Sequence, residues 1–230
     1  MKLIKAIFAC SLVALTACSS SSSGGDSSSQ EEKNIKKELF EGTKKENLFN
    51  LGKTSGYEIK GTFTKNEKVT HYTTGMKGNI LYLNFEEISG GGWHYMACKL
   101  SADGNTCYTC TYLSDLTPFG DKQERNGEAF KLNFENSVGY FYEASKPAVY
   151  NNSKYMGNET LGNYETYKFE YSEDLGAVKQ NIVSYVEGQY GITVKIVTEY
   201  LKGEERTYYK NVSVTSFKTG DDVVIPNFDI

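Results

Sequence analysis

The chain has 230 residues, with 25 Lys and Arg against 29 Asp and Glu, which gives a formal net charge of −4. Nucleic acids and anionic lipid surfaces are bound by clustered positive charge, so this balance argues against a nucleic-acid partner and against a polybasic membrane contact. The 18 Tyr, 12 Phe and only 3 Pro are typical of a strand-rich protein, because aromatic side chains fill the pleated surface of a sheet.

The N-terminal segment has the layout of an export signal. Lys2 and Lys5 precede residues 6–17, an uncharged and mostly apolar run of 12 residues. A helix that spans a bilayer needs about 20 apolar residues. The run is therefore too short for a membrane-spanning helix, and we interpret it as part of a signal peptide.

The end of this segment predicts a lipid anchor. Leu15-Thr16-Ala17-Cys18 resembles the bacterial lipobox, in which small residues precede a cysteine. The resemblance implies that the Cys18 thiol receives a diacylglycerol and that residues 1–17 are cleaved off. Two acyl chains hold a protein stably on a membrane, so we expect the mature protein on the extracytoplasmic face of the cell membrane. The alternative is an ordinary signal peptide in which the cysteine occurs by chance.

Residues 18–33 are expected to form a tether. Residues 19–30 are almost entirely Ser and Gly, a composition that buries no apolar surface and stays flexible. The folded domain is then expected to comprise residues 34–230, held away from the bilayer.

The folded part is predicted to begin with a helix. Ile35, Leu39 and Phe40 fall on one face of a predicted helix over residues 31–51, which Gly42 is expected to break or kink. A second short helix is expected to continue the apolar face with Leu48, Phe49 and Leu51.

Strands are predicted from Tyr57 onward. Tyr57, Ile59, Gly61 and Phe63 alternate with polar residues, which indicates a strand with one buried face. Further strands are predicted over 69–74 and 80–85, followed by a loop over 89–92. Residues 93–100 and 106–113 are expected to form a hairpin, with Gly104 adopting positive φ in the turn.

The segment 129–144 fits two structures. Phe130, Phe134, Val138 and Phe141 have helical spacing, whereas Phe130, Leu132 and Phe134 also alternate as in a strand. We favour a helix because its pattern holds over the longer span, and we expect a loop over 116–127 before it.

The remainder is predicted to be strand after strand. The clearest alternation is Tyr190, Ile192, Val194 and Ile196. A turn over 202–205 leads to a long strand over 207–217, and 223–228 is expected to be an edge strand, where Pro226 is tolerated. Successive strands joined by short turns favour an antiparallel meander that curls.

Several segments resemble the LolA-like family of lipoprotein-sorting and lipid-binding lipoproteins. They are 75–82, 156–167, 185–187 with 191–195, and 224–228. The resemblance implies a mainly β, α+β fold: a curved antiparallel sheet that forms an unclosed half-barrel with two or three covering helices. It also implies an apolar concave face that accommodates acyl chains.

These features predict a protein that binds a lipid or another apolar ligand in the concave face. The alternative is a surface module that interacts with a protein or glycan without a buried ligand, and other envelope proteins are possible partners in either case. Trp93 is a candidate for ligand stacking, although core packing is the commoner role of such a residue. The candidate ligand-binding residues are Tyr57, Ile59, Phe63, Trp93, Tyr190, Ile192, Val194 and Ile196.

Three cysteines of the hairpin, Cys98, Cys107 and Cys110, are disulfide candidates, since exported proteins can keep such bonds. A turn over 101–104 would place Cys98 opposite Cys107, and a turn over 103–105 would place it opposite Cys110. Both registers stay open at this point, and either leaves one thiol over. A redox CxxC or a zinc site is less favoured, because the CxxC lies in a strand-like run without a second ligand pair.

No catalytic arrangement is recognisable in the sequence. The two histidines, His71 and His94, lack a flanking nucleophile motif, so a Ser-His-Asp mechanism is unsupported. Adjacent carboxylates on a strand point to opposite faces and do not converge on one substrate or metal. We therefore expect a protein that is not an enzyme and that needs neither a cofactor nor a metal.

Overall fold

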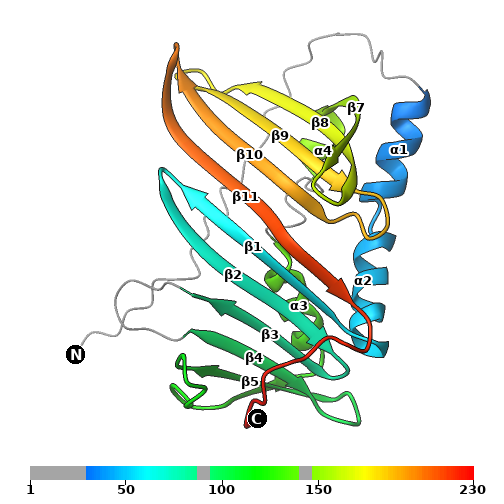
Figure 1. The fold of residues 1–230 in the computed structure, drawn as a ribbon, viewed down its shortest axis with the longest axis vertical. Coiled ribbons are helices and arrows are strands. Elements are labelled where there is room, and N and C mark those ends of the chain that lie inside the picture. The colour runs from blue at the N-terminus through cyan, green and yellow to red at the C-terminus, as the bar shows by residue number, and fades with distance from the viewer. Residues whose placement is uncertain (1–29, 87–93, 140–146) are drawn as a thin grey trace.

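The computed structural model describes residues 30–86, 94–139 and 147–230. These residues form one sheet of eleven strands with four helices (Figure 1). No helix within the described ranges is both long and apolar enough to cross a membrane. The strands are β1 (Tyr57–Lys65), β2 (Lys68–Lys77), β3 (Ile80–Phe85), β4 (Tyr95–Leu100), β5 (Thr106–Tyr112), β6 (Gln123–Asn126), β7 (Lys154–Leu161), β8 (Tyr164–Asp174), β9 (Lys179–Glu187), β10 (Thr193–Lys202) and β11 (Glu205–Thr219).

The sheet consists of two meanders joined through the first and last strands. Its order is β6-β5-β4-β3-β2-β1-β11-β10-β9-β8-β7, and every neighbouring pair is antiparallel. Tyr57 pairs with Thr219 and Phe63 with Val212, with an irregularity between Lys60 and Gly61. The edge strands β6 and β7 do not pair with each other, so the half-barrel stays open and the predicted fold class is confirmed.

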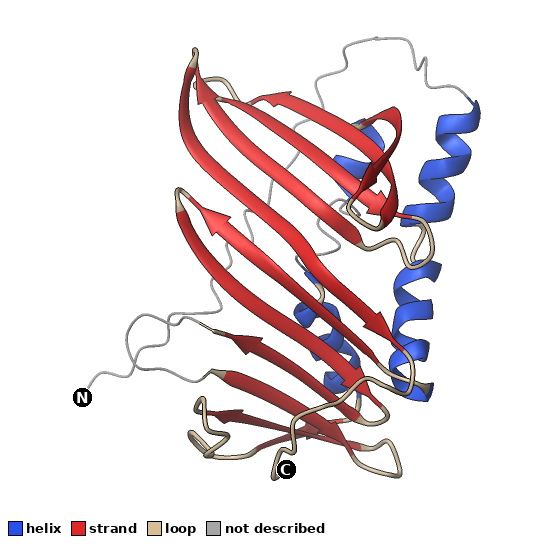
Figure 2. Ribbon diagram, in the orientation of Figure 1, coloured by secondary structure: helices blue, strands red, loops and turns tan. Residues whose placement is uncertain are grey.

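The helices cover the sheet from one side (Figure 2). They are α1 (Gln30–Phe40), α2 (Thr43–Thr54), α3 (Glu128–Ser137) and α4 (Pro147–Asn152). Gly42 separates α1 from α2 at φ 87°, a left-handed conformation that favours glycine, so the predicted break is confirmed. Because α1 begins at Gln30, residues 30–33 belong to a helix and not to the predicted tether.

The helical interpretation of the ambiguous segment is confirmed where the structure describes it. Within and just after α3, Phe130, Phe134 and Val138 are buried, whereas Leu132 is 55% exposed. Burial at every third or fourth residue is the pattern of a helix that lies on a sheet. Phe141 lies outside the described residues.

Aromatic side chains of α2 and α3 form the centre of the core. The Phe134 ring lies 5.0 Å from the Phe49 ring and 6.2 Å from the Tyr57 ring, both in edge-to-face geometry. The Phe130 ring lies 6.3 Å from Phe49. These residues belong to one buried cluster with side chains from both halves of the sheet, including Ile59 and Ile196. The core therefore lies between the helices and the concave face.

A buried carboxylate holds the turn between β9 and β10. Glu187 is 8% exposed, and its two oxygens accept hydrogen bonds from the backbone N–H groups of Gln189, Tyr190 and Ile192 at 2.8, 2.7 and 3.0 Å. A buried charge is tolerated when it is fully hydrogen-bonded in this way. The turn is thus fixed so that Ile192 enters the core.

The predicted edge strand over 223–228 is wrong, because this segment is not part of the sheet. It crosses the opposite, convex face, where the Phe228 ring lies 5.1 to 5.9 Å from the rings of Tyr82, Tyr95 and Tyr112. Covering these rings buries apolar surface of the segment, which stabilises it on this face. The predicted loop over 116–127 also contains the short strand β6.

We predict that Phe134→Ala lowers the free energy of unfolding by about 3–5 kcal/mol, because it leaves a cavity under α3. Leu132→Ala on the same helix is the matched control and should change it by less than about 0.5 kcal/mol, because Leu132 is exposed. Urea unfolding followed by circular dichroism measures both values. Equal losses in the two variants would contradict the placement of α3.

Candidate functional site

The predicted concave-face residues lie in the protein's own core. Tyr57, Ile59, Ile192 and Ile196 are at most 1% exposed. All four belong to the cluster that includes Phe49 and Phe134, and Val194 is also buried. Burial raises the pKa of the Tyr57 hydroxyl, which therefore stays protonated. These side chains make internal contacts and do not line an open cavity.

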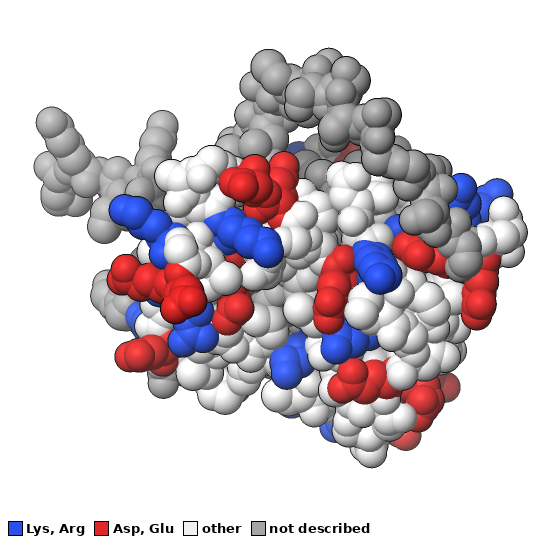
Figure 3. Space-filling view, turned by 90° about the horizontal axis from the view of Figure 1, so that it is seen from above, with Lys and Arg blue, Asp and Glu red and all other residues white. Residues whose placement is uncertain are grey.

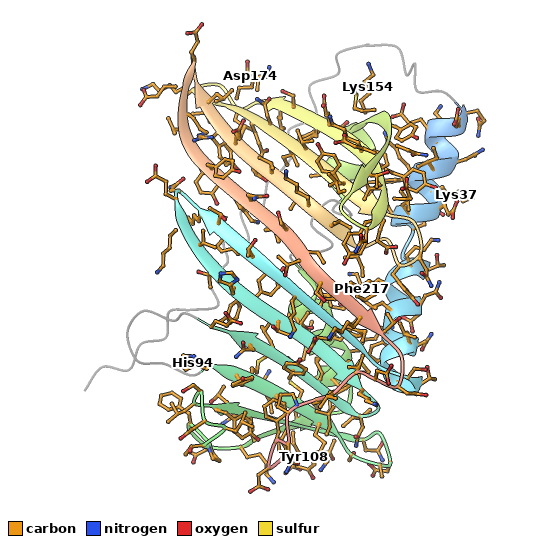
Figure 4. The ribbon with its side chains drawn as sticks, in the orientation of Figure 1. Lys37, His94, Tyr108, Lys154, Asp174 and Phe217 are labelled. Carbon is orange, nitrogen blue, oxygen red and sulfur yellow. The ribbon has the colours of Figure 1, made fainter. Side chains whose placement is uncertain are left out.

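Two further candidates are only partly buried. Phe63 and Tyr190 pack against the edge of the same cluster. The Tyr190 ring meets the Phe217 ring edge to face at 5.5 Å, and Figure 4 shows Phe217 near the middle of the sheet. Trp93, the predicted stacking residue, lies outside the described residues.

The hairpin register differs from both predicted registers. Cys98 is opposite Thr109, Leu100 is opposite Cys107, and Ala97 is opposite Cys110. No two cysteines are directly opposite each other, and all three are buried with free thiols in this structure. Both predicted registers of the hairpin are therefore wrong, whereas the predicted disulfide itself stays a prediction.

Asp103 explains this register. Its carboxylate accepts hydrogen bonds from the Ser101 hydroxyl at 2.5 Å and from the Asn105 backbone N–H at 3.1 Å. These hydrogen bonds lower the pKa of the Asp103 carboxyl, and the bond from Ser101 has the largest effect. Ser101 also pairs with Thr106, which leaves residues 102–105 in the turn, and Gly104 has φ 75° as predicted. The side-chain bonds of one aspartate thus decide between turns that differ by one residue.

A surface groove lies where α1 meets β7 and β8. Its volume is about 520 Å³, and it combines the rings of Tyr155 and Tyr167 with amide and carboxylate side chains. The two rings lie 6.2 Å apart at 44°. The groove is lined by Glu31, Asn34, Ile35, Glu38, Tyr155, Asn158 and Tyr167.

Internal bonds hold the groove in shape. The Tyr155 hydroxyl donates to Asn158 Oδ1 at 2.7 Å, and the Tyr155 backbone N–H donates to Glu32 of α1 at 3.4 Å. Glu32 also pairs with Lys36 at 2.8 Å, and Lys36 Nζ donates to the backbone carbonyl of Ser153 just before β7. Since both side chains of this ion pair are largely buried, α1 is held firmly against the start of β7.

The groove continues around α1 into a second hollow. This hollow has a volume of about 390 Å³ and shares Asn34 and Glu38 with the groove. Glu38 pairs with Lys44 at 3.3 Å. Figure 4 marks this end of the molecule with Lys37 and Lys154, and Figure 3 shows acidic and basic side chains interspersed over the surface seen from above. The second hollow is lined by Asn34, Lys37, Glu38, Glu41 and Thr43.

Sequence reasoning missed the groove because its parts are more than a hundred residues apart. Glu31, Asn34 and Glu38 lie on the polar side of α1, while Tyr155 and Tyr167 come from β7 and β8. Only the docking of α1 brings them together. Among the described residues, no group of three or more His, Cys, Asp or Glu side chains is placed to hold a metal ion.

Comparisons with known proteins identify no family. No family model matches the chain. No curated protein matches it either.

Solved structures give only distant likenesses. A chain of the Pseudomonas aeruginosa MucA/MucB complex matches with 10% identity and a TM-score of 0.38, over 77% of this chain and 56% of that chain. An uncharacterized conserved protein from Thermus thermophilus matches with 8% identity and a TM-score of 0.38, over 77% and 88%. A DUF1329 family protein from Desulfovibrio piger matches with 10% identity and a TM-score of 0.22, over 79% and 92%. Likeness at this level carries no argument about function.

Proposed function

We propose that the protein is a lipid-anchored extracytoplasmic binding protein that holds a glycan in the groove between α1 and the β7–β8 hairpin. The observation that carries this proposal is the pair of tyrosine rings at 6.2 Å, surrounded by the side chains of Asn34, Asn158 and Glu31. The proposed activity is binding without catalysis.

The groove has the chemistry that a sugar requires. A pyranose ring presents apolar C–H faces and a rim of hydroxyl groups. Aromatic rings bury the C–H faces, while amides and carboxylates exchange hydrogen bonds with the hydroxyls. Asn34 and Asn158 are both exposed, and Tyr155 and Tyr167 are half-buried, so the groove offers both kinds of contact at its surface.

A lipid in the concave face, which the LolA-like resemblance implies, is less well supported. An acyl chain there would have to replace contacts that Phe49 and Phe134 already make with Tyr57 and its neighbours. Burying one such aromatic side chain contributes about 1.5–3 kcal/mol, so moving α2 and α3 away from the sheet would cost several times this amount. The exposed groove needs no such rearrangement.

The anchor is tested by palmitate labelling of the full chain in a bacterial host. We predict that the wild-type protein takes up the label and sediments with membranes, because two acyl chains hold it there. Cys18→Ala should lose both properties, whereas Cys10→Ala, which removes the cysteine inside the apolar run, should keep both. Palmitate label that persists in Cys18→Ala would refute the proposed lipid anchor at Cys18.

Glycan binding is tested with the unlipidated chain, residues 19–230, on an array of bacterial and host oligosaccharides, followed by calorimetric titration of the strongest hit. We predict that the double variant Asn34→Ala/Asn158→Ala binds at least about tenfold more weakly, because each lost hydrogen bond contributes about 1 kcal/mol.

Asn47→Ala is the matched control, because Asn47 is an exposed asparagine of α2 that does not line the groove. It should bind as the wild type does. Either no oligosaccharide retained on the array, or equal affinity of the double variant and the control, would refute the glycan site.

A further inference from the structure

Two of the three hairpin cysteines face the same side of the sheet. Cys98 is opposite Thr109, and Cys107 lies two residues before Thr109 on β5. Because side chains alternate along a strand, Cys98, Thr109 and Cys107 all point to the concave face. Cys98 and Cys107 are therefore diagonal neighbours across the β4–β5 pair, and each thiol shifts the pKa of the other.

The third cysteine is on the other face. Cys110 is opposite Ala97 and belongs to the convex cluster with Tyr82, Tyr112 and Phe228. The sheet itself separates it from the other two thiols. Of the three possible cysteine pairs, the register therefore allows only Cys98 with Cys107.

The pair lies beneath α3. Cys98 and Cys107 are both 0% exposed and share the core cluster with Phe130. The Cys98 Sγ lies 3.5 Å from the Thr109 hydroxyl, which also accepts a hydrogen bond from the Asn133 amide of α3 at 3.4 Å. Polar contacts therefore fix the Cys98 thiol beside its neighbour.

The two thiols are not equivalent. The neighbouring Cys98 thiol lowers the pKa of Cys107 to about 7, whereas the Cys107 thiol, together with burial, raises the pKa of Cys98. A thiolate is the species that attacks a disulfide. Cys107 is therefore the first nucleophile and Cys98 the second.

From this geometry we infer that Cys98 and Cys107 are joined by a disulfide in the exported protein, which leaves Cys110 as a free thiol. The Cys107 thiolate attacks one sulfur of an external disulfide RSSR, forms a mixed disulfide and releases RS⁻. Cys98 then loses its proton and attacks the Cys107 sulfur, which releases the second RS⁻. The protein loses two electrons and two protons, and RSSR becomes two RSH.

This exchange takes place during folding. Both thiols are inaccessible once α3 covers the hairpin, so RSSR must reach Cys107 after β4 and β5 have paired, which brings the two thiols together, and before α3 packs. The bond would then tie β4 to β5 at the end of the sheet where the edge strand, β6, has only four residues. In the cell this step relies on the extracytoplasmic location proposed above, but in solution it does not.

The test refolds the unlipidated chain, residues 19–230, from reduced, denatured protein in a buffer of oxidised and reduced glutathione. The refolded protein is then unfolded in guanidinium chloride that contains iodoacetamide, so that every free thiol is reached and blocked, and the intact mass is measured. We expect a chain with one blocked thiol. Its mass should lie about 2 Da below that of a reduced chain with one blocked thiol, because the disulfide removes two hydrogen atoms. Three blocked thiols on folded protein would overturn the inference, whatever the outcome of the glycan and palmitate experiments.

The pairing is read by non-reducing peptide mapping. Trypsin cuts after Lys99 and separates Cys98 from Cys107, but Cys107 and Cys110 stay on one peptide. Cys110→Ser is therefore the matched control, and it should keep the cross-link to Cys98, whereas Cys107→Ser should lose it. A cross-link that survives in Cys107→Ser, or that disappears in Cys110→Ser, would assign the bond to the wrong face and contradict the inference. The wild-type map, read by fragmentation of the linked peptide, gives the same answer if a variant fails to fold.

Discussion

An open antiparallel sheet with an apolar inner face is stable in water only if something covers that face. Here the cover is supplied by α2 and α3, whose rings at Phe49, Phe130 and Phe134 meet side chains from both halves of the sheet. The sheet halves meet where β1 pairs with β11, so the cluster under the helices also holds this junction together. Everything else in the fold is arranged around that cover. On the N-terminal side of Gly42, α1 covers β7 to β9, and the C-terminal segment covers the convex face of β3 to β5.

The same cover bears on the binding site that we propose. Because the concave residues are already in contact with the helices, the proposed site lies outside the core, beside α1. There the buried pair of Glu32 and Lys36 fixes the helix, and the tyrosine pair of β7 and β8 supplies a rigid aromatic surface. A rigid and preformed groove favours binding, because little side-chain entropy is lost when the ligand arrives.

Much of the fold could be predicted from the sequence, because its determinants are local. The alternation from Tyr57 to Phe63, the helical spacing of Phe130 and Phe134, and the break at Gly42 each depend on neighbours within a few residues. The hairpin register could not be predicted, since the bonds of Asp103 choose between turns that differ by one residue. The groove could not be predicted either, because it exists only once α1 has docked on β7, more than a hundred residues later. The position of the C-terminal segment 223–228 could not be predicted either, because its apolar pattern suits a sheet edge as well as a sheet face.

The central claim is that, among the described residues, the protein's own side chains fill the concave face beneath α2 and α3. Native mass spectrometry of residues 19–230, purified without detergent and then incubated with phospholipid, tests it most directly. The account predicts the mass of the bare chain before and after incubation, because an acyl chain has no space beside Ile59 and Ile196. A stoichiometric lipid adduct that survives desolvation, and that is lost when Ile196 is replaced by Asp, would contradict the account and place the ligand inside the half-barrel.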